Sequence, residues 1–126
     1  MAATHFSGPV IVGDKEEKTS NYTVVITTDS GKTFTSKTDG VVFTLPSIAV
    51  GNVFTFINTA RDGVAGLTIS PAALDGITYA GSSTDDKDLI NTKATSKEGD
   101  YVKLAALDGT TAWQVVEAKG IWAKEA

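Results

Sequence analysis

The stretch from Asn21 to Asn58 most constrains the fold, because it is a series of short apolar runs separated by turn-forming residues. The runs are rich in Val, Ile, Phe and Thr and end at Gly, Pro, Asp or Ser, which is typical of consecutive β-strands joined by tight turns. Phe54 and Phe56 are two residues apart, so in a strand both side chains point to one face. We expect one wall of a core to be supplied by Phe34, Phe43, Leu45, Phe54 and Phe56.

The same pattern continues to the C-terminal region, with turn residues between apolar runs. It predicts strands over residues 22–28, 33–36, 41–45, 53–58, 67–70, 77–79, 101–107 and 112–117. Residues 89–94 fit no element clearly, and Asp108-Gly109-Thr110-Thr111 is predicted to be a hairpin turn. The sequence shows no sustained helical periodicity, heptads or internal repeat. These features predict an all-β fold, a single antiparallel β-sandwich or barrel that is jelly-roll-like.

Residues 1–20 differ from the rest and are predicted to form an extended N-terminal arm and linker, ahead of a β-sandwich or barrel domain at 21–126. At 126 residues the chain is long enough for one core but not for two. The first part of the arm is apolar and broken by Gly and Pro, and the charged run DKEEKTS follows it. A tail exposed only to water seldom carries so many apolar side chains. The candidate contact residues of the arm are His5, Phe6, Pro9, Val10, Ile11 and Val12.

Composition argues against several classes of function. The net charge is −4 and Arg61 is the only arginine, whereas nucleic-acid binding needs clustered Lys and Arg. The chain has no cysteine, so neither disulfides nor thiolate chemistry are available. The N-terminus lacks the pattern of a secretory signal, and no run approaches the ~20 apolar residues of a membrane span. We expect a protein made in the cytoplasm that binds neither nucleic acid nor membrane.

No residue pattern indicates catalysis, a cofactor or a metal. His5 is the only histidine and lies in the predicted arm, without the rigid frame that a catalytic or metal-binding histidine needs. The cluster Asp85, Asp86 and Asp88 lacks the glycine and terminal glutamate of an EF-hand loop, so a solvated loop is the better interpretation. Ser30-Gly31-Lys32 resembles the end of a phosphate loop, but the upstream glycine and the following helix are missing, so a turn is the better interpretation.

Two further groups of residues were considered as sites. Asp75, Glu98 and Glu117 cannot be paired into a glycosidase site from sequence, because carboxylate separation is a three-dimensional quantity. The aromatic residues of the C-terminal half could stack on sugars, although aromatic residues in strands more often belong to the core. They are Tyr79, Tyr101, Trp113 and Trp122. We therefore expect a protein that is not an enzyme.

The chain resembles small structural proteins encoded by tailed bacteriophages, often near head genes. HFSGPV, close after the first Met, is the most specific part of the resemblance. The order of a strand, DSGKTF, VVFTLP, an FTF strand, LTISP and YVKLAALDGTTAWQVV with a terminal G-x-W also resembles them. The resemblance covers nearly the whole chain, and it rests on turn and strand patterns rather than on catalytic motifs. Such proteins are identified as head decoration (cement) proteins or as β-rich domains of head and tail fibres.

The resemblance implies a virion protein on the outer capsid surface, commonly a homotrimer, whose partner is the major capsid protein. It would bind between capsomers after the shell expands and stabilise the head against the pressure of packaged DNA, with the N-terminal arm as the capsid or inter-subunit contact. The alternative within this class is a head-fibre or tail-appendage domain that binds host glycans through Trp and Tyr. A lectin-like module or a small carbohydrate-active enzyme is the alternative from another class.

Overall fold

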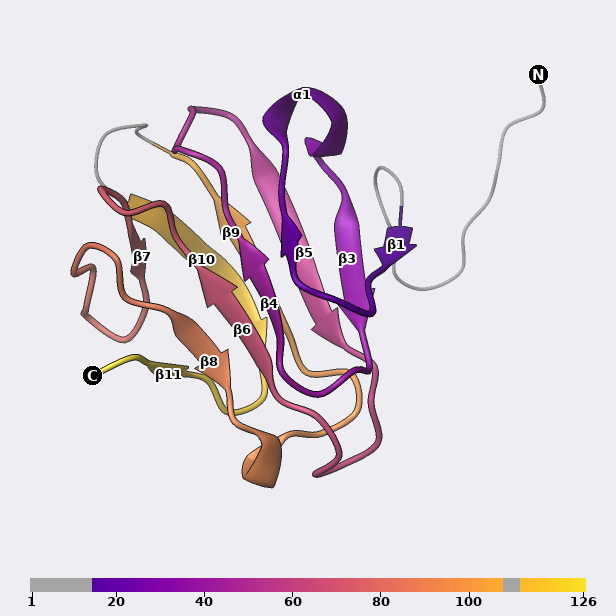
Figure 1. The fold of residues 1–126 in the computed structure, drawn as a ribbon. Coiled ribbons are helices and arrows are strands. Elements are labelled where there is room, and N and C mark those ends of the chain that lie inside the picture. Colours follow the sequence, from indigo (N-terminus) through magenta and orange to yellow (C-terminus); the bar gives the residue numbers. More distant parts are fainter. Residues whose placement is uncertain (1–14, 108–111) are drawn as a thin grey trace, which may run out of the picture.

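The structure is a computed structural model that describes residues 15–107 and 112–126. It is mostly β, with one four-residue α-helix and one short 3-10 helix among these residues (Figure 1). The elements, in chain order, are β1 (Lys15–Glu17), β2 (Tyr22–Thr23), α1 (Ile26–Asp29), β3 (Thr33–Ser36), β4 (Val41–Thr44), β5 (Val53–Asn58), β6 (Leu67–Ser70), β7 (Gly76–Thr78), β8 (Leu89–Asn91), η1 (Lys93–Thr95), β9 (Tyr101–Ala105), β10 (Ala112–Lys119) and β11 (Ala123–Lys124).

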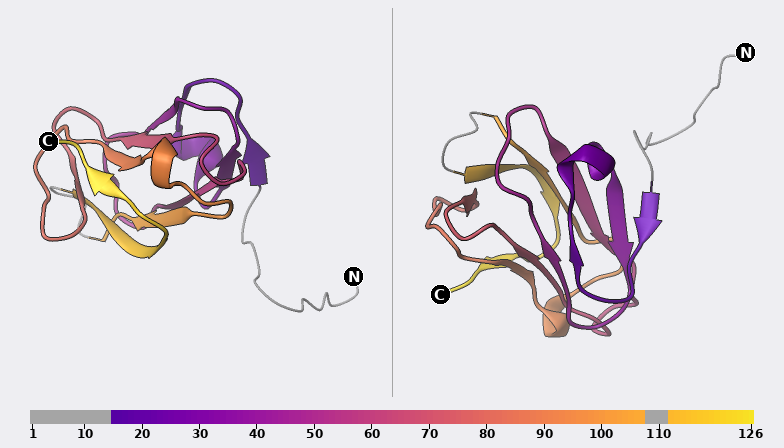
Figure 2. Two further views of the ribbon diagram at one scale, coloured as in Figure 1. Left: turned by 90° about the horizontal axis from the view of Figure 1, so that it is seen from below. Right: turned by 45° about the horizontal axis from the view of Figure 1, so that its top comes forward.

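The strands form two sheets. The first is six-stranded with the order β1-β3-β5-β9-β10-β7, and the second is five-stranded with the order β11-β8-β6-β4-β2. From β1 to β6 the chain alternates between the sheets, so that each pair of successive strands adds one strand to each sheet. β1 and β11 lie on opposite sides of the molecule (Figures 1 and 2). Among the described residues, no helix is long and apolar enough to cross a membrane.

The expectation of antiparallel sheets is wrong, because both sheets are mixed. Of the strand pairs described, five are parallel and four antiparallel. Four of the parallel pairs join a strand to its second successor, as β3 and β5 do, and the fifth joins β7 to β10. Short strands with tight turns do not specify whether the chain turns back within a sheet or crosses to the other one.

The core lies between the sheets. The residues at its centre were predicted correctly, but their division between the two sheets was not. Phe34, Phe43, Leu45, Phe54 and Phe56 are all buried, as expected. They do not form one wall, however, because Phe43 belongs to the five-stranded sheet and the other three phenylalanines to the six-stranded sheet. The rings of Phe43 and Phe56 meet across the core at 5.0 Å between centroids, and Phe34 and Phe43 at 5.6 Å. Such tilted pairs add to the burial of apolar area.

Most strand predictions are confirmed to within a residue or two, but the first one is wrong. Only Tyr22–Thr23 of the predicted strand 22–28 is a strand, and Ile26–Asp29 is a helical turn. The turn forms because the Asp29 carboxylate accepts a hydrogen bond from the Val25 N–H, at 2.8 Å. Lys15–Glu17, inside the segment expected to be arm and linker, forms β1. The predicted hairpin turn at 108–111 lies outside the described residues.

Parallel neighbours place apolar residues opposite each other in both sheets. Thr33-Phe34 in β3 stands opposite Thr55-Phe56 in β5, and the two phenylalanine rings stack at 5.7 Å. In the other sheet, Phe43 of β4 stands opposite Ile69 of β6. In both pairs of strands the apolar side chains that stand opposite each other are buried.

Candidate attachment site

The N-terminal edge of the six-stranded sheet is the strongest candidate site, because the predicted arm joins the body there. β1 pairs in parallel with β3, with Lys15 opposite Thr33 and Glu17 opposite Thr35. The Lys18 N–H extends this ladder by donating to the Thr35 carbonyl at 2.9 Å. Within the described part of the chain, no strand pairs with the other side of β1. Its position fixes where residues 1–14 leave the domain.

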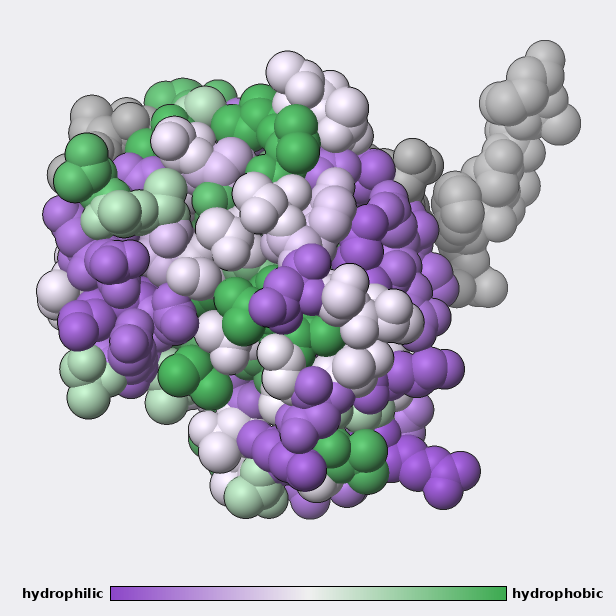
Figure 3. Space-filling model, viewed as in Figure 1, coloured by the Kyte–Doolittle hydropathy of each residue, from purple (hydrophilic) through white to green (hydrophobic). Residues whose placement is uncertain are grey.

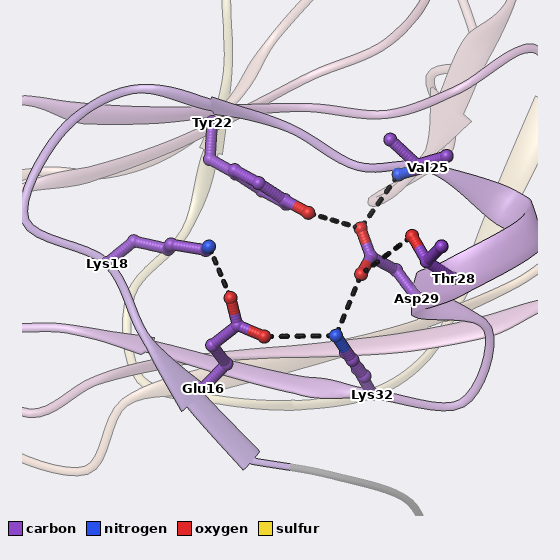
Figure 4. Close-up of polar contacts among 7 residues, drawn as sticks. All are labelled: Glu16, Lys18, Tyr22, Val25, Thr28, Asp29 and Lys32. Atoms are coloured by element: carbon purple, nitrogen blue, oxygen red, sulfur yellow. Dashed lines mark hydrogen bonds and ion pairs between the residues drawn. The ribbon is translucent and has the colours of Figure 1, made fainter.

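The buried carboxylate of Asp29 stabilises this edge of the sheet (Figure 4). Asp29, at the end of α1, is 1% exposed. Its Oδ2 accepts hydrogen bonds from the Tyr22 hydroxyl at 2.6 Å and from the Val25 N–H at 2.8 Å. Its Oδ1 accepts from the Lys32 ammonium at 3.0 Å. A charged group that is buried in this way is tolerated because it is fully hydrogen-bonded and paired.

Lys32 connects this carboxylate to β1. Its Nζ also donates to Oε2 of Glu16 at 3.0 Å, and the other oxygen of Glu16 accepts from Lys18. The Lys18 ammonium in turn lies over the Tyr22 ring, 3.7 Å from its centroid. Figure 4 shows these side chains converging from β1, β2, α1 and the residues just after β1 and just before β3. We call Glu16, Lys18, Tyr22, Asp29 and Lys32 the edge cluster.

In the edge cluster, the pKa values of Glu16, Tyr22, Asp29 and Lys32 are shifted in the direction that keeps these groups in their charge states at neutral pH. Burial acts to raise the pKa of Asp29, but the hydrogen bonds from Tyr22, Val25 and Lys32 outweigh it, and the pKa is lowered. The hydrogen bond to Asp29, together with burial, raises the pKa of Tyr22 to about 12. Hydrogen bonds to Glu16 and Asp29 raise the pKa of Lys32.

These shifts make the cluster unsuited to acid–base catalysis near pH 7. A general acid or base works best with a pKa close to the working pH, and each shift moves its group away from it. The arrangement instead holds a three-residue edge strand in place through charge-assisted hydrogen bonds. The cluster is therefore a structural anchor at the root of the predicted arm.

The structure places the sequence-predicted residues as follows. His5, Phe6, Pro9, Val10, Ile11 and Val12, the candidate contacts of the arm, all lie outside the described residues. Ser30-Gly31-Lys32 forms the turn into β3, as predicted, with Gly31 at a φ of +81°. Lys32 also has a role that sequence reasoning missed, since it joins the two carboxylates of the edge cluster.

Of the four aromatic residues considered for stacking on sugars, the two tryptophans are buried. Trp113 is fully buried against Phe54, with ring centroids 5.6 Å apart, and Trp122 is 6% exposed. Tyr79 packs on the core, and the Tyr101 hydroxyl donates to Glu117 at 3.1 Å. Stacking on a sugar needs an exposed ring face, which neither tryptophan offers.

The acidic residues do not converge either. Asp75 is buried and accepts from the Ile48 N–H at 2.9 Å, whereas Glu98 and Glu117 are exposed. Asp85 and Asp86 are exposed and Asp88 is half-buried. Within residues 15–107 and 112–126, no group of three His, Cys, Asp or Glu side chains could hold a metal ion.

Sequence reasoning assigned no role to Asp29. The available signal was weak: an aspartate followed three residues later by a lysine, after an apolar run. The Tyr22 partner lies seven residues away and Glu16 thirteen, so only the fold brings them together.

No protein-family model matches the chain, and neither does any curated protein sequence.

Proposed function

We propose that this protein is a bacteriophage capsid decoration (cement) protein. It binds the outer surface of the head between capsomers, through contacts with the major capsid protein, and stabilises the shell against internal DNA pressure. Homotrimers would place three copies of the N-terminal arm around each attachment point. The proposal assigns no enzymatic activity and no cofactor.

The observation that carries the proposal is the anchored edge strand. β1 is short, charged and fixed to β3 by the edge cluster, and the segment before it contains the HFSGPV motif and the apolar residues Val10, Ile11 and Val12. A rigid body with an apolar segment attached at a sheet edge is suited to binding by strand addition or groove insertion. Several such contacts on one assembly gain affinity from their linkage, even when each is weak.

We also propose that the two mixed sheets form a β-sandwich. Support comes from the single core, to which both sheets contribute fully buried side chains. The parallel neighbours distinguish this arrangement from an antiparallel jelly roll.

The alternative, a head-fibre or tail-appendage domain that binds host glycans, receives less support, because both tryptophans are buried. A glycan array with the isolated protein tests it directly. Saturable binding of one class of sugar would favour this alternative and count against decoration.

The decisive experiment uses heads assembled without the protein. Added full-length protein is expected to occupy symmetric positions in electron cryomicroscopy maps and to raise the temperature at which filled heads burst. A variant without residues 1–13 should bind weakly or not at all. A second variant, F6S/V10S/I11S/V12S, keeps the length of the arm and should behave like the deletion. Unchanged binding of both variants would reject the arm as the contact, and equal burst temperatures would reject the stabilising role.

A further inference from the structure

The two ends of the molecule differ sharply in charge. Among the described residues, four segments lie at the end nearest α1, namely residues 25–30, 46–52, 71–75 and 106–107. We call these four segments the uncharged end, because their only charged residues are Asp29 and Asp75, and both are buried. The exposed Asp86 borders them, since its N–H donates to the Asp75 carbonyl at 2.9 Å. The opposite end, reached through β3 and β5, exposes many charges, namely Lys37, Asp39, Arg61, Asp62, Lys93, Lys97 and Glu98.

Hydrogen bonds hold the four segments of the uncharged end together. The Ser30 hydroxyl donates to the Asn52 side chain at 2.8 Å. The Ala106 N–H donates to the Asn52 carbonyl, and the Gly51 N–H donates to the Ala106 carbonyl, both at 2.9 Å. The bond from the Ile48 N–H to Asp75 joins the β4–β5 and β6–β7 connections. The surface is therefore fixed rather than assembled from independent loops.

Each of these segments exposes one large apolar side chain. Leu74 is 85% exposed, Val50 65%, Leu107 63% and Val25 44%. In Figure 3, hydrophobic residues gather along the upper rim, over α1 and the neighbouring loops. Single exposed apolar residues are ordinary, but several on one uncharged surface usually mark a contact site.

The geometry points to one occupant: we propose that, in the free protein, residues 1–13 of the same chain cover the uncharged end. This segment carries the large apolar residues Met1, Phe6, Val10, Ile11 and Val12 and none of Asp, Glu, Lys or Arg, so its chemistry matches the surface. It also starts from the right place. β1 runs parallel to β3 with Lys15 opposite Thr33, the first residue of β3 after α1. The chain before Lys15 therefore approaches from the uncharged end.

The length of the segment fits this path. Strands in a sheet are about 4.8 Å apart, so a six-stranded sheet is about 24 Å wide from its first strand to its last. The nine residues from Phe6 to Lys15 can span up to about 30 Å when extended. Phe6 can therefore reach Leu74 beyond β10, while Val10 and Val12 lie closer to Val25 and Val50. A short tether gives an effective concentration in the millimolar range, which favours the same chain over a second copy in dilute solution.

Paramagnetic relaxation in NMR tests this inference. The chain has no cysteine, so V10C provides a unique site for a nitroxide label. The expected result is loss of the amide signals of Val50, Leu74 and Leu107, with recovery when the nitroxide is reduced. The amide signals of Arg61 and Lys97 at the charged end should remain. Retained signals at the uncharged end would overturn the inference.

Matched variants and a mixed sample complete the test. In the labelled protein, V50S/L74S should restore the amide signals at the uncharged end, while V64S, which changes a 51% exposed valine near Arg61, should not. A mixture of labelled protein without ¹⁵N and unlabelled protein with ¹⁵N should show no loss. Loss in the mixture would mean that a second copy provides the segment, which contradicts the proposal. These measurements use the free protein, so their failure would leave shell binding untouched.

Discussion

Asp29 is the residue on which the N-terminal edge depends most. Replacing it by Asn keeps the shape but removes the charge that Tyr22 and Lys32 satisfy, and it turns one acceptor into a donor. Loss of hydrogen bonds to a buried charged group costs roughly 1–3 kcal/mol, so D29N should lower the free energy of unfolding by about that amount. Urea denaturation at pH 7 measures it. D85N, at an exposed aspartate, is the control and should leave stability unchanged.

The lowered pKa of Asp29 gives this effect a pH dependence of known sign. The carboxyl group of an unfolded aspartate has a pKa of about 3.9. As the pH falls, the unfolded state therefore takes up a proton before the folded state does. The contribution of Asp29 is therefore complete above that value and is lost as the pH falls through the folded pKa. The stability difference between wild type and D29N should shrink below about pH 4. A difference that stays constant down to acid unfolding would contradict this account.

Tyr22 should make the folding stability depend on pH in the alkaline range. Its folded pKa is about 12, raised from 10 chiefly by the hydrogen bond to Asp29. A raised pKa means that the folded state holds its proton longer, so stability is lost as the pH rises from 10 towards 12. The wild type should lose stability over this interval, and Y22F should lose less. Thermal unfolding followed at several alkaline pH values measures it, with Y79F as a control.

At the scale of elements, a buried polar network joins both sheets near the charged end. The Asn58 amide of β5 donates to the Asn91 side chain of β8 at 2.8 Å, and the Asn91 amide donates to Asp100 at 3.1 Å. Asp100 also accepts from the Lys97 N–H at 2.9 Å. Gly120, in the β10–β11 connection, leaves room for Asp100. A Cβ at Gly120 would lie 2.3 Å from the Asp100 side chain.

This network predicts a difference between two glycine substitutions. Gly40 and Gly120 both have positive φ, +83° and +99°, but a Cβ at Gly40 meets nothing within 4 Å. G40A should cost about 1 kcal/mol of backbone strain, and G120A should cost at least about 2 kcal/mol more because it displaces a buried hydrogen-bonded carboxylate. Chemical denaturation of the two variants gives the comparison. Equal losses would mean that Asp100 moves aside freely.

The elements also show how far the sequence could predict the fold. β3, β5 and β6 were placed correctly because short runs of strand-forming residues and the turn residues around them are local signals. The pairing was not predictable in the same way, because a strand that crosses to the other sheet has the same local pattern as one that turns back. The role of Asp29 was missed because Tyr22 and Glu16 come close to it only in the fold. The helix α1 was missed because a single turn is too short to show helical periodicity. The arm was predicted from composition, and residues 1–14 are not described.

At the scale of the whole molecule, the alternation of strands between two sheets makes almost every pairing non-local. The single core shared by both sheets means that neither can keep its apolar face covered alone. We therefore expect one cooperative unfolding transition, and refolding on the millisecond to second scale typical of folds with many non-local contacts. Far-UV circular dichroism reports both sheets, whereas fluorescence of Trp113 and Trp122 reports the core between them. The two denaturation curves should coincide in wild type and in the V64S surface control. A fluorescence change that precedes the loss of β-structure would show that the sheets separate before they unfold, and would contradict a single cooperative body.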